Sequence, residues 1–317
     1  MNLDDRSHDD PGLRSVLREH FGDGVEAVEP LVGGFFSRAY AVSAGGREYV
    51  VRLNAAAHAA ESFAKDDYAW RHFASADLPI PHIVAIGETD AEYYAISERV
   101  AGRTLMDCSE AELRAALPAL LDALEALAGA DTSGSTGYGD WDGEGNARFG
   151  SWQEFLADII ENHPKGYFKD WHRFLRNGFI ERDVFETVYG RMLQLAEGCP
   201  DMRALVHNDY QFENVIVDGE KITGVIDWAN ALYGDPLYDV AWLGWISIHP
   251  GWWYEDGIEI LHERFGTAPG YDTRVTCYEL HIGLDHLRFY ATTGRREDYE
   301  FCRDWLLAKI DDARGTR

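Results

Sequence analysis

The chain has 317 residues, 46% of them hydrophobic, and 55 acidic residues outnumber 29 basic ones to give a formal net charge of -26. This length allows a large buried core, and the charge argues against a nucleic-acid partner, because a phosphate backbone would be repelled. No apolar run approaches the roughly 18 residues of a membrane span, and the polar, acidic start is unlike a signal peptide. We therefore expect a cytoplasmic protein with no membrane partner.

The excess of acidic residues has two interpretations, and both can hold at once. The acids are spread over the whole chain, which favours a solvated surface suited to high salt or to solubility. Alternatively, an acidic cleft would attract a polycationic substrate. The cysteines are far apart and form no C-x-x-C pair, so we expect reduced thiols and no zinc site at Cys108, Cys199, Cys277 and Cys302.

The first part of the chain is predicted to form a small antiparallel sheet with helices. Apolar and β-branched spacing predicts a helix at 13–21, strands at 28–31, 39–43 and 48–53, and a helix at 56–74. The turn between the first two strands contains Gly33, Gly34 and Ser37, and its amides could lie over phosphates. Two glycines alone fit a plain hairpin turn better, so this interpretation depends on a phosphate-handling motif elsewhere.

Most of the remaining chain is predicted to be helical. The string S-E-A-E places a capping box at Ser109 and Glu112 at the start of a helix that reaches residue 130. A Gly-rich stretch at 132–150 follows, and its aromatic residues favour packing over a disordered linker. Further helices are predicted at 151–162, 181–197, 278–291 and 297–310.

A compact polar motif follows the apolar pair Leu205-Val206. His207, Asp209 and Asn214 have the order His-x-Asp-x-x-x-x-Asn, which is the spacing of the catalytic loop of phosphoryl-transfer enzymes. An Asp beside a substrate hydroxyl can orient it and accept its proton, and an amide oxygen five residues later can reach a magnesium ion on the phosphates. The spacing predicts Asp209 as the catalytic base and Asn214 as a metal ligand, with His207 in a supporting role.

A β-hairpin is predicted directly after this motif, because the Asp-Gly turn at 218–219 separates two β-branched runs. The hairpin returns the chain to Asp227, beside Asn214. A carboxylate and an amide oxygen suit Mg²⁺, which keeps its other positions for phosphate oxygens and water. Taken singly, each of these residues would be expected to cap a turn or a strand end. A two-metal hydrolase built on His207, Asp209 and Asp227 is disfavoured, because no further cluster completes the metal set.

A family resemblance is carried by the stretch from His207 to Leu243, which reads HNDYQFENVIVDGEKITGVIDWANALYGDPLYDVAWL. It resembles the aminoglycoside phosphotransferase family, and the likeness runs from about Phe36 to about Leu287. The resemblance implies an α+β, protein-kinase-like fold of two lobes: a small antiparallel-sheet lobe that binds nucleotide at 1–100, and a mostly helical catalytic and substrate-binding lobe at 101–317. It also implies ATP and Mg²⁺ as cofactors, with phosphoryl transfer to a hydroxyl of an aminoglycoside such as hygromycin B.

The resemblance also implies roles for residues of the first lobe. Arg52 stands where the kinase pattern has the Lys that pairs with the α- and β-phosphates, and Lys65 is a weaker candidate because it would lie on a helix. Asp66 falls where the family has a Glu that pairs with the strand cation, with Asp67 as the alternative. The hinge whose backbone meets adenine is expected at Ser97, Glu98 and Val100.

In the second lobe, Asp239 resembles the acid that supports the catalytic loop by hydrogen bonding, while Asp235 is expected to cap a helix. Asn230 and Asp285 are candidates for contacting substrate. At Asn230 the chain departs from the family, whose members carry an acid nearby, and losing that carboxylate would weaken binding of an ammonium group by about 1.5 to 3 kcal/mol.

Other functions remain open at this point. The acceptor could be another amino sugar, an amino alcohol or a metabolite. A non-catalytic nucleotide sensor is disfavoured by the complete set of Asp209, Asn214 and Asp227, and a protein kinase is disfavoured because no A-P-E-like activation segment is found. We expect a monomer or a weak dimer.

Overall fold

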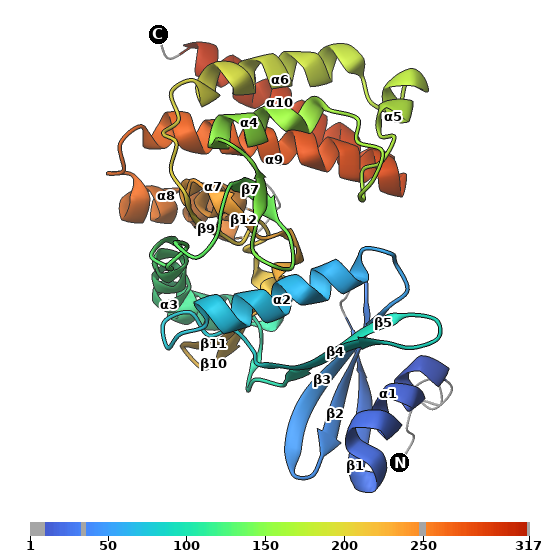
Figure 1. Cartoon of the computed structure of the whole chain (residues 1–317). Coiled ribbons are helices and arrows are strands. Elements are labelled where there is room, and N and C mark those ends of the chain that lie inside the picture. Colours follow the sequence, from blue (N-terminus) through green and yellow to red (C-terminus); the bar gives the residue numbers. More distant parts are fainter. Residues whose placement is uncertain (1–9, 33–35, 247–251, 316–317) are drawn as a thin grey trace. The chain divides into compact units, whose positions relative to one another are not determined.

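The computed structural model describes residues 10–32, 36–246 and 252–315 (Figure 1). Gly33 and Gly34 of the predicted nucleotide loop lie outside these ranges, so the structure describes that loop only from Phe36 onward. None of the helices within the ranges is long and apolar enough to cross a bilayer.

The chain folds into two compact units, and neither is one continuous stretch of sequence. The first unit runs up to Thr136 and also takes Asp140–Asn146 and Phe212–Ala231. The second unit takes Gly137–Gly139, Ala147–Gln211 and the residues from Leu232 onward. The boundary predicted near Ala101 does not separate these compact units. As a division between nucleotide binding and substrate binding, it stays a prediction.

The first unit is built on an antiparallel sheet of five strands in the order β1-β2-β3-β5-β4. Its strands are β1 (Val25–Leu31), β2 (Arg38–Ala44), β3 (Arg47–Asn54), β4 (Ile83–Glu88) and β5 (Tyr93–Glu98). Successive side chains of a strand point to opposite faces, and β5 follows this rule. Tyr94 and Ile96 pack in the cluster that contains Leu13 of α1 (Pro11–Phe21), whereas Ala95 packs on Phe63 of α2 (Ala59–Phe73).

A second, smaller sheet completes the first unit. It has the order β11-β10-β6 and consists of β6 (Arg103–Thr104), β10 (Val215–Asp218) and β11 (Lys221–Val225). The antiparallel pair β10–β11 is the predicted hairpin, closed between Asp218 and Lys221. Gly102 precedes β6 with a φ of 108°, and a Cβ there would lie 2.0 Å from the carbonyl oxygen of Val217, so only glycine allows β6 to approach β10 this closely.

The second unit is mostly helical. Its helices are α4 (Trp152–Ala157), α5 (His172–Arg176), α6 (Arg182–Ala196), α7 (Leu237–Ile246), α8 (Trp252–Phe265), α9 (Tyr271–Thr293) and α10 (Arg296–Gly315). Helix α9 packs against α6, α7 and α10. A four-stranded sheet has the order β8-β7-β12-β9, with β7 (Tyr138–Trp141), β8 (Ala147–Phe149), β9 (Ala204–Val206) and β12 (Leu232–Gly234).

The elements agree closely with the sequence prediction. Each predicted strand of the first sheet and each predicted long helix is present, with ends that differ by up to seven residues, the largest difference being at the start of α9 (Tyr271). The Gly-rich stretch at 132–150 is partly β7 and β8, and its Trp141 is buried, which confirms that the aromatic residues pack. The predicted helix at 151–162 is shorter, since α4 ends at Ala157 and a 3₁₀ turn follows.

Helix α3 (Glu110–Ala128) begins with the predicted capping box. The N–H of Glu112 donates to Ser109 Oγ, and the N–H of Ser109 donates to the Glu112 carboxylate. We expect Ser109→Ala to lower the free energy of unfolding by about 1 kcal/mol, because helix N–H groups lose an acceptor. Urea denaturation followed by circular dichroism measures the change. Ser15→Ala, at an exposed serine inside α1, is the control and should stay within about 0.5 kcal/mol of the parent; equal values for the two variants would contradict the capping role.

Candidate active site

The predicted catalytic loop begins where the buried strand β9 (Ala204–Val206) ends. The N–H groups of His207 and Asn208 donate to the two carboxylate oxygens of Asp239, at 2.7 and 2.8 Å. Asp239 lies on α7 and is almost fully buried. The support that the sequence predicted for this loop is therefore a pair of backbone hydrogen bonds to one side chain, directly before Asp209.

Asn208 has a left-handed backbone conformation, with a φ of 58°. Such a conformation is uncommon outside glycine and is tolerated best by Asn and Asp. The indole Nε1 of Trp242 donates to Asn208 Oδ1 at 3.0 Å, so α7 holds both the backbone and the side chain of this residue. The consequence is a fixed direction for the chain at Asp209, the next residue.

Asp209 itself is half-buried and lies in a short turn. Gln211 donates to it twice: its N–H reaches the Asp209 carbonyl oxygen at 2.9 Å, and its Nε2 reaches Asp209 Oδ1 at 2.7 Å. The bond from Nε2 limits rotation of the carboxylate, and the bond from the N–H holds the backbone of the turn.

The pKa of Asp239 is raised to about 7, because the effect of burial outweighs the opposite effect of the hydrogen bonds from the His207 and Asn208 amides. The ionised carboxylate is the form that accepts both amide bonds with full strength. The support of the predicted catalytic loop thus depends on an acid whose pKa lies close to neutral pH.

The two predicted metal ligands lie at neighbouring positions of the first unit. Asn214 ends the 3₁₀ turn Phe212–Asn214 and is buried, and Asp227 follows β11. The N–H of Ile226 donates to the carbonyl oxygen of Asn214 at 2.9 Å, so the hairpin brings the two backbones together as predicted. Asp227 has a φ of 64°, a conformation that concentrates at functional positions because it costs energy.

A cation and two carboxylates face one another beside this hairpin. Arg52 Nη2 on β3 lies 2.5 Å from Asp66 Oδ2 on α2, and the N–H of Trp228 donates to Asp66 Oδ1 at 2.9 Å. The pKa of the Asp227 carboxyl is raised by burial and by the negative charge of Asp66, and lowered by the Arg52 guanidinium. The positive charge of Arg52 therefore offsets the negative charges of both Asp66 and Asp227.

The alternatives to this ion pair are engaged elsewhere. Lys65 Nζ lies 2.5 Å from Asp140 and donates to the carbonyl oxygen of Ala231 at 3.0 Å, and Asp67 pairs with Arg71 at 2.7 Å. The predicted pairing of Arg52 with Asp66 is confirmed. Its role toward phosphates stays a prediction.

Asn214 and Asp227 fit a magnesium ion that also binds phosphate oxygens. They offer hard oxygen donors, and the raised pKa of the Asp227 carboxyl, on a half-buried residue, marks a charge that a cation would stabilise. Within the described ranges, no group of three or more His, Cys, Asp or Glu side chains could hold a metal.

The predicted hinge residues lie at the end of β5. Ser97 pairs with Val50 of β3, and the N–H of Glu98 donates to the His82 carbonyl oxygen at 2.9 Å. Val100 packs on β11, since a Cβ at Gly224 would lie 2.9 Å from its side chain. The hinge segment is thus anchored to both sheets of the first unit.

The remaining candidates, Ser37, Asn230 and Asp285, lie at half-buried or exposed positions. Ser37 Oγ accepts a hydrogen bond of 3.4 Å from Asn54 Nδ2, and Asn230 is exposed at the end of the turn Trp228–Asn230. Asp285 of α9 forms an ion pair with Arg288. The pKa of Tyr167 is raised first by burial and second by the negative charge of Asp285. Asp285 is therefore a partly neutralised acid.

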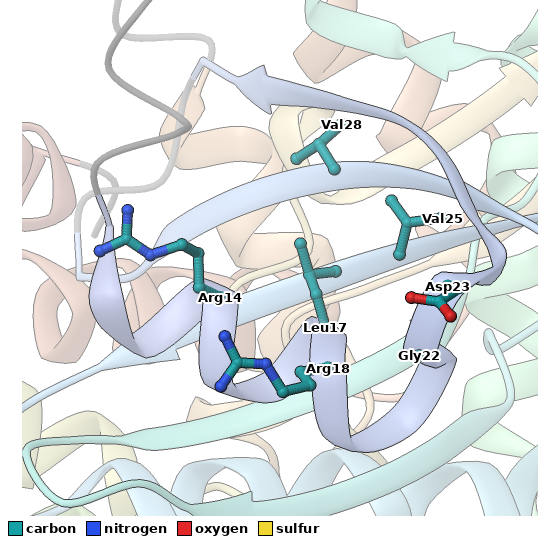
Figure 2. A pocket seen from close by; sticks show the side chains of 7 residues that line it. All are labelled: Arg14, Leu17, Arg18, Gly22, Asp23, Val25 and Val28. Atoms are coloured by element: carbon teal, nitrogen blue, oxygen red, sulfur yellow. The ribbon is translucent and has the colours of Figure 1, made fainter.

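Several residues that shape the loop were not predicted. Trp242 donates to Asn208 and Gln211 donates to Asp209. Of these contacts, only Asn208 carried a signal in the sequence, because Asn tolerates a left-handed conformation. A separate pocket of about 400 Å³ is lined by residues that include Arg14 and Arg18 of α1 and Val25 and Val28 of β1 (Figure 2). None of the predicted site residues lines it.

Known proteins resemble this chain along most of its length. It is 35% identical over 309 residues to the hygromycin-B 4-O-kinase of Escherichia coli. The aligned region covers 96% of this chain and 86% of that protein. It is 28% identical over 222 residues to the homoserine kinase of Methylobacillus flagellatus, covering 68% of this chain and 61% of that protein.

A solved structure agrees with these sequence relatives. The thermostable mutant of aminoglycoside phosphotransferase APH(4)-Ia, in a ternary complex with AMP-PNP and hygromycin B, superposes with a TM-score of 0.83 at 33% identity, covering 95% of this chain and 99% of that one. The predicted α+β, kinase-like fold is confirmed. The model of the phosphotransferase enzyme family matches residues 27–276. The chain belongs to the phosphotransferase enzyme family.

Proposed function

We propose that the protein transfers the γ-phosphoryl group of ATP, with Mg²⁺, to a hydroxyl of an aminoglycoside such as hygromycin B. The observation that carries this proposal is the clamped catalytic loop, in which Asp239 and Trp242 fix the residues directly before Asp209. Resemblance to a hygromycin-B 4-O-kinase and to an enzyme bound to AMP-PNP and hygromycin B supports the choice of donor and acceptor.

Asp209 has the role of base in this reaction. Its carboxylate orients the acceptor hydroxyl and takes its proton as the hydroxyl oxygen forms a bond to the γ-phosphorus. The bond from that phosphorus to the bridging oxygen breaks, and ADP leaves with the electron pair. Little covalent chemistry falls to the protein, so the rate depends on positioning, which the bonds from Gln211 to Asp209 provide.

The first unit supplies charge for the nucleotide. Asn214 and Asp227 would hold Mg²⁺, which when bound offsets the negative charge of the phosphates. Arg52 can donate to phosphate oxygens while Asp66 holds its guanidinium. Ser37, Gly33 and Gly34 would line the phosphates, and Ser97, Glu98 and Val100 the adenine. We assign nucleotide binding to 1–100, and catalysis and acceptor binding to 101–317.

The identity of the acceptor is the finer part of this proposal. Asn230 supplies an amide instead of an acid, and the Asp285 charge is shared with Arg288. Both features reduce the charge available for ammonium groups, so another amino sugar, an amino alcohol or a metabolite is the second candidate, which the resemblance to a homoserine kinase supports. A cytoplasmic location, where ATP is supplied, and a monomer or weak dimer belong to the same proposal.

We expect Asp209→Asn to lower kcat at least about a hundredfold while leaving MgATP binding unchanged, because the amide cannot accept a proton. Steady-state kinetics and calorimetric titration with MgATP measure the two effects. Asp272→Asn, at an exposed acid of α9, is the control and should keep the parent kcat. Near-normal turnover of Asp209→Asn would remove Asp209 from the role of base.

Asp227→Ala is expected to abolish magnesium-dependent binding of ATP, because the metal loses its carboxylate ligand. Titration with ATP in the presence of Mg²⁺ and of EDTA separates this effect from metal-independent binding. Asp218→Ala changes an exposed acid of the same hairpin and should bind MgATP like the parent. An unchanged MgATP affinity in Asp227→Ala would count against Asp227 as a ligand.

A coupled assay of ATP consumption with Mg²⁺ tests the function as a whole. Aminoglycosides including hygromycin B, amino alcohols and homoserine are offered at low and high salt, with Asp209→Asn as the blank. We expect turnover with an aminoglycoside and a rate that falls with salt if the acidic surface attracts the cationic acceptor. Turnover only with the other acceptors would replace the aminoglycoside. MgATP binding without turnover of any acceptor would favour a nucleotide sensor.

A further inference from the structure

A buried cluster around Asp235 joins α7 to α9. Asp235 is fully buried, and Arg274 of α9 donates to both of its carboxylate oxygens, from Nε to Oδ2 at 2.7 Å and from Nη2 to Oδ1 at 2.5 Å. Tyr278, one turn further along α9, donates its hydroxyl to Oδ2 at 2.5 Å. The capping role that the sequence suggested for Asp235 is present too, since Oδ1 accepts the N–H of Leu237 at 3.0 Å.

The same helix then holds the catalytic loop. From its first residue, which Asp235 caps, α7 runs to Asp239 and Trp242, and these two side chains make three hydrogen bonds to His207 and Asn208. Because α7 is a single rigid element of 10 residues, a shift or rotation at its N-terminus moves all three bonds together. Only the loop backbone separates them from the carboxylate of the proposed base.

We propose that Arg274 is a positioning residue for phosphoryl transfer, acting through Asp235 and α7 on the residues that precede Asp209. The expected effect of Arg274 on kcat rests on the proposed function, whereas its expected effect on the position of the loop does not. Arg274 does not touch the reacting groups in this scheme. It determines where α7 begins, and α7 determines where the loop lies.

The geometry of the pair requires arginine in particular. The planar guanidinium makes two parallel bonds to the carboxylate, and its third nitrogen, Nη1, donates to the carbonyl oxygen of Pro269 at 2.9 Å. A lysine carries the same charge as a single point and cannot reproduce this fork. Arg274→Lys therefore keeps the buried charge compensated while it releases the N-terminus of α7.

The test uses matched variants of the full-length protein. Arg274→Lys and Tyr278→Phe each weaken the hold on Asp235. Tyr299→Phe is the control: Tyr299 is also a fully buried tyrosine, and its hydroxyl accepts the N–H of Glu181 at 2.8 Å, away from α7. For each variant, kcat, the KM for MgATP, the melting temperature and amide hydrogen exchange of residues 204–211 are measured below the melting transition.

We expect Arg274→Lys to lower kcat at least about tenfold, since small misplacements of reacting groups have effects of this size or larger. Its KM for MgATP should stay within about twofold of the parent, and exchange at His207 and Asn208 should accelerate. Tyr278→Phe should show the same changes to a smaller degree. Tyr299→Phe should lower the melting temperature without changing kcat or exchange in the loop.

The exchange measurement separates this inference from the proposed function. If the parent turns over no acceptor, the proposed function fails. Faster exchange at 207–208 in Arg274→Lys than in the parent still supports the positioning role, because this measurement does not depend on turnover. If Arg274→Lys loses thermal stability as Tyr299→Phe does but keeps the parent kcat, or keeps the parent exchange at 207–208, Arg274 is a structural residue and the inference is overturned.

Discussion

The candidate site depends on the rule that a buried charge must be compensated. Asp66 is almost fully buried on α2, and an unpaired carboxylate there would be very costly. Its partners, the Arg52 guanidinium and the N–H of Trp228, come from β3 and from the turn after β11. A single side chain thereby joins a strand, a helix and the segment that carries Asp227, and the position of the Arg52 guanidinium follows from it.

In the second unit, the same rule applies to the proposed catalytic loop. Asp239 and Asp235 are buried acids on or beside α7, and the first is compensated by backbone amides, the second by Arg274 and Tyr278. Hydrogen bonds to charged groups are stronger than neutral ones, so these acids determine the geometry of the residues around them. The proposed base needs such a rigid setting, because phosphoryl transfer depends on positioning more than on covalent chemistry.

Short-range patterns in the sequence predicted the parts of the structure that are local. The hairpin at β10–β11, the capping box of α3 and the loop spacing of Asp209 and Asn214 each depend on residues a few positions apart. The contacts that were missed join distant segments: Lys65 with Asp140, and Arg274 with Asp235. Periodicity and turn chemistry carry no information about such pairs, and for Arg52 with Asp66 only the family resemblance indicated the partner.

The discontinuity of the first unit has a consequence for how the chain is made. Its last segment, Phe212–Ala231, is synthesised after residues 147–211, which belong to the second unit. On the ribosome, the N-terminal sheet emerges long before Asn214 and Asp227, which flank the hairpin β10–β11, and residues 147–211 of the second unit emerge in between. Domains generally fold as units during synthesis. Here neither unit is one continuous stretch of the chain, so neither is complete when the first half has been synthesised. Completion of folding therefore waits for the C-terminal third of the chain.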